Sequence, residues 1–308
     1  MITKFGKRFL TNYLAGNIQF AKRELALGIG STSPNAKGND TKLEFEFCRI
    51  PVNLNTIEIS QTGTDQDGDP VFSYKAVFLG TIPQDISGVV SEVGLYPSSR
   101  KSFLNYDSKF ITSFENNLMW SDSSGNNPGT RTNSTSPAFT SKIGENMIYV
   151  DVASSSTKEY TAAVNSLDLS GYSVNDSLAI AYKKADDNLS KIRIKFYSSA
   201  SNYCYVDFTP QAIGSSADKI QSITLNSLFS NTSATPPDFT NIIKIGVEVT
   251  ANSNGATRVY FDGLRINDED TFDPEYGLIS RSILAGNDIL YKTSGRQVDI
   301  EYKLQLGF

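Results

Sequence analysis

Short segments in which apolar and polar residues alternate recur along the chain, and this pattern constrains the fold more than any other feature. Ile148, Val150 and Val152 alternate with polar residues, and residues 192–197 and 243–249 follow the same pattern. Successive side chains of a strand point to opposite faces of its sheet, so each segment predicts a strand with one buried face. Clusters of Ser, Asn, Gly and Pro separate the segments, as turns separate strands. Helical periodicity is scarce, so the sequence predicts a mainly β protein.

The middle of the chain differs from its two ends. Residues 103–268 are rich in Ser and Asn and contain enough alternating segments for a jelly-roll β-sandwich. Residues 1–102 and 269–308 combine their apolar residues with Glu, Lys and Arg instead. Residues 269–308 hold too few strands to fold alone. We therefore expect the two ends to form one discontinuous, β-rich docking domain into which the sandwich is inserted.

One segment near the N-terminus has helical periodicity. Residues 3–15 place Phe5, Phe9 and Tyr13 on one side, and Gly16 follows as a C-terminal stop. The segment predicts a helix whose aromatic stripe covers the adjacent sheet. Docking of the same stripe against another protein subunit is the alternative.

Four stretches of the first hundred residues each predict a strand: residues 43–50, 56–60, 73–79 and 89–96. Residues 63–70 connect two of them and contain Asp65, Asp67 and Asp69 around a glycine, a spacing that resembles part of a calcium-binding loop. The distal Glu of such loops is missing. A solvated hairpin turn is therefore expected there in preference to a metal site.

Charge and composition narrow the classes of partner. The net charge of −5 argues against nucleic-acid binding, which needs clustered positive charge. No apolar run reaches the length that crosses a bilayer, so no membrane insertion is expected. The basic N-terminus has no apolar stretch behind it, which argues against a signal peptide and for synthesis in a cytoplasm. Cys48 and Cys204 are expected to be buried free thiols, with an interdomain disulfide as the alternative.

The chain contains no histidine. This removes the commonest general base and the commonest zinc ligand. Chemistry that uses carboxylates alone, as in glycoside hydrolysis, is the enzyme class that remains. It requires two carboxylates across a cleft, and the sequence shows no cluster of carboxylates near its candidate sugar-binding tyrosines. We therefore expect no enzymatic activity, and a carboxylate-dependent glycan depolymerase of a phage tail is the alternative.

The two ends of the chain carry a resemblance. Residues 24–32, 42–51 and 91–96, followed by residues 277–282 and 298–304, occur in an order that resembles virion structural proteins of tailed bacteriophages. Such proteins belong to tails, baseplates or fibres. The resemblance implies a docking domain that assembles with other virion proteins and with copies of itself. It also implies a location in the virion after synthesis in the host cytoplasm.

The middle of the chain resembles another group. Phe114, Glu115 and Trp120, with residues 167–172 and 259–265, are similar to the carbohydrate-binding-module branch of galactose-binding-like sandwiches. In that group a carboxylate of the first strand and an aspartate of the last strand often share a structural calcium. The resemblance places these ligands at Glu115 and Asp262, and oxygen ligands of this kind suit calcium. The alternative is that both residues are ordinary polar residues at strand edges.

The segments 192–197 and 203–208 each have one apolar and one polar face. The polar faces together contain three tyrosines and three charged residues: Arg193, Lys195, Tyr197, Tyr203, Tyr205 and Asp207. Aromatic rings cover the apolar faces of sugars while charged groups bind their hydroxyls, so these residues predict a glycan-binding site for host surface polysaccharide. The alternative is that loops or a neighbouring subunit cover this face. Trp120, the single tryptophan, is expected in the core.

Overall fold

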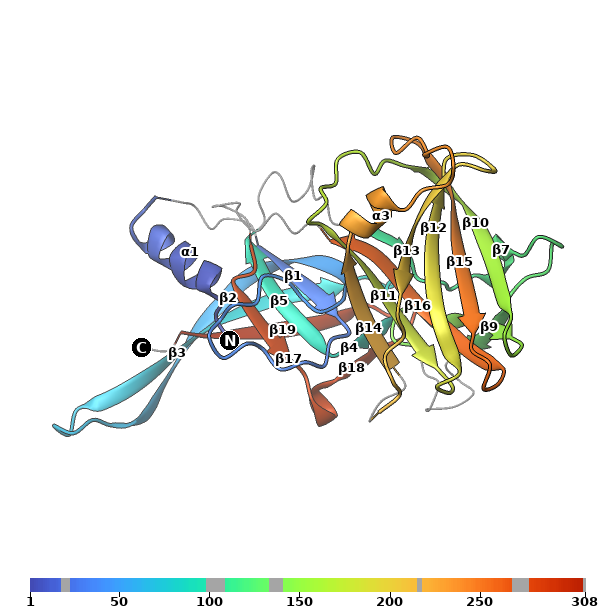
Figure 1. The fold of residues 1–308 in the computed structure, drawn as a ribbon. Helices are drawn as coiled ribbons and strands as arrows, with labels where there is room; N and C mark the ends of the chain where they lie inside the picture. The colour runs from blue at the N-terminus through green and yellow to red at the C-terminus, as the bar shows by residue number, and fades with distance from the viewer. Residues whose placement is uncertain (18–22, 98–108, 133–140, 215–217, 268–276, 307–308) are drawn as a thin grey trace. The chain divides into compact units, whose positions relative to one another are not determined.

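The computed structural model of the chain describes residues 1–17, 23–97, 109–132, 141–214, 218–267 and 277–306. Contacts divide the chain into two compact units, Met1–Tyr106 with Thr271–Phe308 (unit 1) and Asp107–Asp270 (unit 2). The predicted boundaries at 102/103 and 268/269 lie outside the described residues. Both units consist mainly of antiparallel strands (Figure 1), which confirms the mainly β prediction.

Unit 1 is built on one six-stranded sheet to which both ends of the chain contribute. Its strands in spatial order are β17 (Ser280–Ile283), β5 (Glu92–Pro97), β1 (Arg23–Gly28), β2 (Glu46–Thr64), β3 (Pro70–Ile82) and β19 (Val298–Leu306). A small second sheet pairs β4 (Gly88–Val90) with β18 (Leu290–Lys292). The C-terminal strands β17 and β19 thus form the two edges of a sheet whose centre comes from the N-terminal part of the chain.

The predicted N-terminal helix is α1 (Lys4–Leu14). Its N-cap Thr3 accepts a hydrogen bond from the amide of Gly6, which satisfies one of the unpaired amides of the first turn. A Cβ atom on Gly6 would lie 2.1 Å from the carbonyl oxygen of Ile279, so glycine is needed for this close approach. Phe9 is buried in the core of the sheet, which confirms that the aromatic stripe packs on its own unit. Tyr13, at the end of the stripe, is exposed.

The structure corrects the prediction of two separate strands at residues 43–50 and 56–60. Residues 46–50 and 56–60 belong to the single strand β2, which runs from Glu46 to Thr64, whereas residues 43–45 precede this strand. Pro51 lies within this strand as the register partner of Glu24 on β1. A register shift between Leu54 and Thr56 marks an irregularity in the pairing, so the alternation restarts without the strand ending.

The predicted hairpin turn at residues 65–69 connects β2 to β3. One carboxylate oxygen of Asp65 accepts hydrogen bonds from the amides of Asp67 and Asp69, at 3.0 and 2.9 Å. Gly68 has a φ of 86°, the left-handed conformation that such a turn requires. The carboxylate of Asp65 is therefore used by the backbone of the turn.

Unit 2 is a β-sandwich of two antiparallel sheets. The first contains β13 (Tyr203–Phe208), β12 (Leu189–Tyr197), β15 (Ile242–Ala251), β10 (Thr157–Leu167) and β7 (Trp120–Ser121). The second contains β14 (Asp218–Thr224), β11 (Ser177–Lys184), β16 (Thr257–Asn267), β9 (Asn146–Val152) and β8 (Gly129–Thr132), with β6 (Lys109–Thr112) paired to β16. A short helix, α3 (Asn226–Ser230), follows β14.

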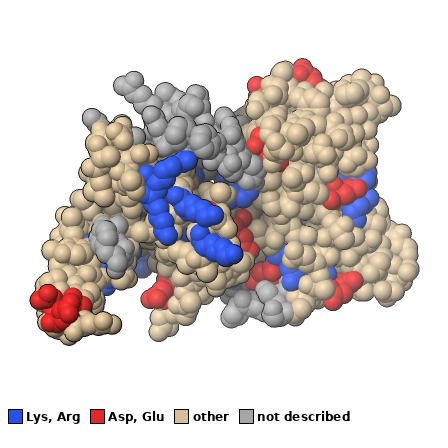
Figure 2. All heavy atoms as spheres, turned by 60° about the vertical axis from the view of Figure 1, so that its left-hand side comes forward, with Lys and Arg blue, Asp and Glu red and all other residues tan. Residues whose placement is uncertain are grey.

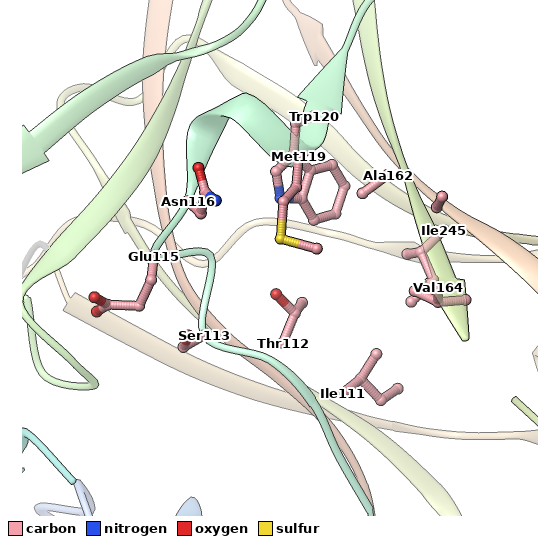
Figure 3. Close-up of a pocket in the computed structure, with 11 residues that line it drawn as sticks. Ile111, Thr112, Ser113, Glu115, Asn116, Met119, Trp120, Ala162, Val164 and Ile245 are labelled. Atoms are coloured by element: carbon pink, nitrogen blue, oxygen red, sulfur yellow. The ribbon is translucent and has the colours of Figure 1, made fainter. Parts of the chain in front are cut away.

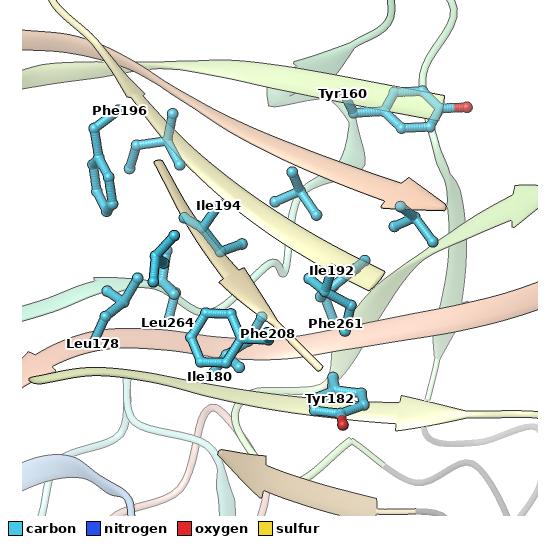
Figure 4. Packing of buried hydrophobic residues seen from close by; sticks show 14 of the residues in the cluster. Tyr160, Leu178, Ile180, Tyr182, Ile192, Ile194, Phe196, Phe208, Phe261 and Leu264 are labelled. Atoms are coloured by element: carbon cyan, nitrogen blue, oxygen red, sulfur yellow. The ribbon is translucent and has the colours of Figure 1, made fainter. Parts of the chain in front are cut away.

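The inner faces of the two sheets form one hydrophobic core (Figure 4). Ile192, Ile194 and Phe196 of β12 are fully buried and belong to the same cluster as Ile180 of β11 and Phe261 of β16. Burying a large apolar side chain contributes about 1.5–3 kcal/mol to the free energy of unfolding, so this cluster is the main source of stability in unit 2. The alternation in the sequence correctly identified the buried faces of these strands except at Ile243, which was predicted on the buried face of residues 243–249 and is 43% exposed, while Ile242 is buried in its place.

Trp120 lies in this core, as predicted, with 3% of its surface exposed. Its ring stacks on that of Phe114 at a centroid distance of 5.1 Å. Cys48 and Cys204 are both free, so the disulfide alternative is wrong. Cys204 is buried as expected, whereas Cys48 is only partly buried. No helix in the described part of the chain is long and apolar enough to span a membrane.

We expect unit 2 to fold without unit 1, because its core is contained within its own two sheets. A fragment of residues 103–268 should unfold in one cooperative transition, followed by the fluorescence of Trp120. The two parts of unit 1, joined by a short Gly/Ser linker, should also unfold cooperatively. A fragment of unit 2 that lacks a cooperative transition would show that the division is wrong.

Candidate functional site

The outer face of the β13-β12-β15-β10 part of the first sheet collects polar side chains. Arg193 is the register partner of Asp207, Lys195 of Tyr205, and Tyr197 of Tyr203. Direct partners in an antiparallel pair project from the same side of the sheet, so the structure brings all six predicted residues together. We call this set the polar face: Arg193, Lys195, Tyr197, Tyr203, Tyr205 and Asp207.

One side of the polar face is organised by Arg193. Its Nε and Nη2 atoms donate hydrogen bonds to the two carboxylate oxygens of Asp207, at 2.6 and 2.8 Å. The guanidinium also lies over the ring of Tyr205, 3.9 Å from its centroid. Burial is the largest single influence and raises the pKa of Asp207, but the hydrogen bond from Arg193 and the positive charges of Arg193, Lys191 and Lys195 together lower that pKa below its ordinary value. The bidentate pair and the cation–π contact hold all three side chains in one arrangement.

The other side is organised by Lys195. Its ammonium lies 2.9 Å from Glu159 on β10 and 2.7 Å from Glu248 on β15. Burial lowers the pKa of Lys195, but the hydrogen bonds with the two carboxylates outweigh burial and raise it. The hydroxyl of Tyr197 donates a hydrogen bond of 2.5 Å to the second oxygen of Glu159. Burial and this hydrogen bond raise the pKa of Tyr197, so the phenol stays protonated.

A glycine makes room at the centre of this arrangement. A Cβ atom on Gly246 would lie 2.5 Å from a carboxylate oxygen of Glu159 and 3.0 Å from the ring of Tyr197. Next to it on β15, the ammonium of Lys244 lies 4.3 Å from the ring centroid of Tyr197. Glycine at this position therefore allows the carboxylate and the ring to meet over the strand.

The six residues differ in how accessible they are. Lys195 and Tyr197 are 7% and 6% exposed, so they form the floor of the face and support it. Arg193, Tyr203, Tyr205 and Asp207 are each about half-buried and form its accessible part. The rings of Tyr203 and Tyr205 lie next to each other, with centroids 6.3 Å apart.

The sequence analysis missed Glu159, Lys244 and Glu248. Lys244 and Glu248 occupy the polar positions of an alternating strand, so the signal was present. Glu159 could be assigned only from the sheet order, which makes it the register partner of Glu248. The expectation that no carboxylates gather near the tyrosines is therefore wrong. Both glutamates, however, are ion-paired with the same lysine, whereas glycoside hydrolysis needs one protonated acid.

Glu115 and Asp262, the predicted calcium ligands, bind the same segment of chain. Asp262 on β16 accepts hydrogen bonds from the Ser141 hydroxyl and from the amides of Lys142 and Ile143, at 2.7, 2.6 and 3.2 Å. Glu115, which follows β6, accepts a hydrogen bond of 3.1 Å from the amide of Asn146. The segment 141–146 therefore lies against both carboxylates.

Both carboxylates are poorly solvated. Burial raises the pKa of Asp262 to about 7, which the hydrogen bonds from Ser141, Lys142 and Ile143 oppose only in part. Burial also raises the pKa of Glu115. In the described part of the chain, no Lys or Arg forms an ion pair with Asp262. Both carboxylate oxygens of Asp262 accept hydrogen bonds from the chain itself.

The described residues contain no group of three or more His, Cys, Asp or Glu side chains that could hold a metal ion. A calcium ion between Glu115 and Asp262 would therefore take its other oxygen ligands from the main chain or from water. Calcium at this place stays a prediction.

A small pocket lies beside Glu115 (Figure 3). Its walls are mainly apolar, with Ile111, Met119, Trp120 and Val164 among them. The carboxylate of Glu115 points away from Trp120 in this view. The pocket thus lacks the convergent polar groups that small-molecule sites use for orientation, and the polar face remains the better candidate.

No protein-family model matches the chain, and no curated protein matches its sequence. Among solved structures, a family 11 carbohydrate-binding module from Clostridium thermocellum is 16% identical, with 52% of this chain and 95% of that chain covered and a TM-score of 0.36. A family 30 module of the same organism is 14% identical over 53% and 98%, with a TM-score of 0.38. An agarase is 12% identical over 54% and 25%, with a TM-score of 0.34. TM-scores this low support no conclusion about the function of this chain, so the function is inferred from the geometry of its own residues.

We expect calcium to stabilise unit 2 more at high pH than at low pH. The pKa of Asp262 in the folded state, about 7, lies above its ordinary value of 3.8. Without calcium, the unfolded chain loses this proton first as pH rises from about 4 to 7, so stability should fall over that range, by about 1.4 kcal/mol per unit of pKa difference. Calcium binds the ionised form and should remove this loss. The melting temperature of unit 2, followed by Trp120 fluorescence with calcium or with chelator, measures both effects.

Two variants serve as controls for this prediction. Asp262→Asn should flatten the pH dependence, because no group then titrates at this position. Glu115→Gln should abolish the response to calcium. A melting temperature that is the same with calcium and with chelator at pH 8 would contradict the calcium site.

Proposed function

We propose that this chain is a non-enzymatic structural protein of a bacteriophage particle, of tail, baseplate or fibre type. It assembles through unit 1 with other virion proteins and with copies of itself. Its unit 2 binds host surface polysaccharide through the polar face. The observation that carries the glycan-binding role is the half-exposed group of Tyr203, Tyr205, Arg193 and Asp207 on a rigid sheet.

The polar face has the two components that sugar recognition needs. The rings of Tyr203 and Tyr205 offer apolar surface to the C–H faces of a sugar ring. Arg193 and Asp207 beside them offer donors and acceptors to its hydroxyls. The ion pairs beneath fix these groups before a ligand arrives, so little conformational entropy is lost on binding.

The assembly role is supported by the order of segments in the two ends of the chain, which resembles that of phage virion proteins. These segments include β1, β5, β17 and β19, which lie in one sheet of unit 1. Their motifs are structural, and they suit a protein that acts by docking to others.

A glycan depolymerase is the second candidate, and one observation favours it. Glu159 and Glu248 are register partners on the polar face, next to the tyrosines, and both contact Lys195. Retaining glycosidases use two carboxylates about 5–5.5 Å apart. The ammonium of Lys195 favours the ionised form of both glutamates, whereas cleavage needs one of them to be protonated. We therefore propose binding without cleavage. Release of reducing ends from host polysaccharide would favour the depolymerase over the non-enzymatic role.

Replacing both accessible tyrosines should strongly weaken glycan binding. The double variant Tyr203→Ala with Tyr205→Ala loses the ring area on which stacking depends, and each ring contributes about 0.5–1.5 kcal/mol beyond its buried area. We expect binding to host cell-wall polysaccharide to weaken about tenfold or more. Single sites of this kind are weak, so the protein should be displayed in many copies on a surface or bead.

Tyr291→Ala is the matched control for this experiment. Tyr291 lies on β18 of unit 1 and is 65% exposed, so its loss removes an accessible ring from elsewhere in the chain. This variant should bind like the unchanged protein. Equal loss of binding in the control and the double variant would show that the polar face is not the site.

The virion role predicts that the chain is present in purified phage particles in a fixed number of copies. An antibody against unit 1, detected on intact particles by electron microscopy, would also locate the chain in the virion. Absence of the chain from purified particles would overturn the assembly part of the proposal and leave the glycan-binding part to its own test.

A further inference from the structure

The hairpin of β2 and β3 extends beyond the rest of its sheet. The neighbouring strand β1 pairs with β2 only as far as Val52, and β19 pairs with β3 only as far as Tyr74. Beyond these residues, within the part of the chain that the structure describes, β2 and β3 pair only with each other, up to Thr64 and Pro70. Figure 1 shows this part as a two-stranded ribbon that points away from α1 and the other strands of unit 1. Two-stranded ribbons alone are only marginally stable in water.

One side of the ribbon is apolar and accessible. Ile57 is the register partner of the buried Ala76, and Ile59 is the partner of Tyr74, so these residues continue the core side of the sheet. Ile57 is 55% exposed and Ile59 is 62% exposed. Five large apolar side chains on this side are exposed, and we call them the ribbon face: Leu54, Ile57, Ile59, Phe72 and Tyr74.

The opposite side of the same ribbon is polar. Glu58 forms an ion pair of 2.7 Å with Lys303, and Ser60 is the register partner of Ser73. Val71 is also exposed on this side, but the large apolar side chains of the ribbon lie mainly on the ribbon face, as in a strand pair that another surface covers on that side. Contiguous exposed apolar side chains of this kind mark interaction sites.

The distribution of apolar and charged side chains in unit 1 indicates that a second copy of this chain packs against the ribbon face. The ribbon face carries no charge, so it fits another uncharged apolar surface, and a second ribbon face supplies one through a twofold axis. The tip of the hairpin carries Asp65, Asp67 and Asp69, all exposed. The acidic side chains at the lower left of Figure 2 show this concentration of negative charge.

The positive charge that would match the tip lies on α1. Lys4, Lys7 and Arg8 are exposed on this helix. On the inner side of α1, Phe9 belongs to the same core cluster as Ala76, so the helix covers the side of the sheet that continues as the ribbon face. At about 3.3 Å per residue, the ribbon from Leu54 to its tip is about 30 Å long. Two ribbons that pack face to face in opposite directions would bring each acidic tip to the helix of the other copy.

We infer that two copies of this chain associate through their ribbon faces in this antiparallel arrangement, with the hairpin tip of each copy on α1 of the other. The inference rests on the assembly role proposed above and names the surface of unit 1 that performs it. Burial of the ribbon faces supplies the affinity, and the contacts between tip and helix set the direction.

Light scattering coupled to size exclusion, over a range of concentrations of the full chain, tests this inference. The unchanged protein should have twice the mass of one chain. The double variant Ile59→Lys with Phe72→Lys places charge in the centre of the ribbon face and should weaken association about a hundredfold. Ser60→Lys adds one such charge to the polar side of β2, next to Ile59, and should leave the mass unchanged. Circular dichroism shows whether each variant remains folded.

A charge exchange tests the direction of packing. Asp67→Lys with Asp69→Lys reverses the tip without removing Asp65, which holds the turn, and should weaken association about tenfold. Lys7→Glu with Arg8→Glu should have a similar effect. The chain that carries all four changes should regain the affinity, because opposite charges again meet.

Three results would overturn the inference. The first is a mass of one chain at every concentration. The second is a dimer that persists in the double variant Ile59→Lys with Phe72→Lys. The third is a chain with all four charge changes that does not regain the affinity of the unchanged protein. A monomer that binds lipid vesicles or another virion protein through the ribbon face would give the first of these results. A monomeric chain that is nevertheless found in virions would refute the inference and leave the proposed function in place.

Discussion

Burial of the apolar face of β12 and β13 in unit 2 determines where their remaining side chains point. Ile192, Ile194 and Phe196 occupy the core between the two sheets, and a shift of one residue would expose all three. The residues between them, Arg193 and Lys195, must therefore lie on the outer face. The polar face is in this sense a consequence of the hydrophobic core, and its geometry is as fixed as the register of the strands.

The ion pairs of the polar face then decide which residues can meet a ligand. Lys195 is almost fully buried, and removing either Glu159 or Glu248 would leave part of its charge without compensation. These three residues act as support. Tyr203 and Tyr205 are partly exposed, so a ligand can reach their rings without breaking an ion pair. Rigid support under accessible rings is an arrangement that favours recognition over catalysis.

Alternation in the sequence was sufficient to predict most of the side chains that a strand buries. It was not sufficient to predict which strands are neighbours in a sheet. It correctly placed six residues on one face, because β12 and β13 are consecutive strands joined by a short turn. It missed Glu159, because β10 joins this face only through the sheet order. It divided β2 into two strands, because Pro51 and the irregularity after Leu54 interrupt the pattern without ending the pairing. The meeting of Glu115 and Asp262 at one segment depends on the path of a loop, which has no periodicity.

The same alternation has a different consequence in unit 1. In unit 2 each apolar sheet face is covered by the other sheet, whereas β2 and β3 continue past the last residues of β1 and β19 that pair with them. In the described residues the two strands of the ribbon pair only with each other, and the apolar face of the ribbon is not buried. An exposed strand pair of this kind could in principle recruit copies without limit. The three aspartates at the tip oppose parallel stacking, because it would bring like charges together. Charge at the end of the ribbon therefore limits what its apolar face would otherwise permit, and favours a closed pair over an open-ended array.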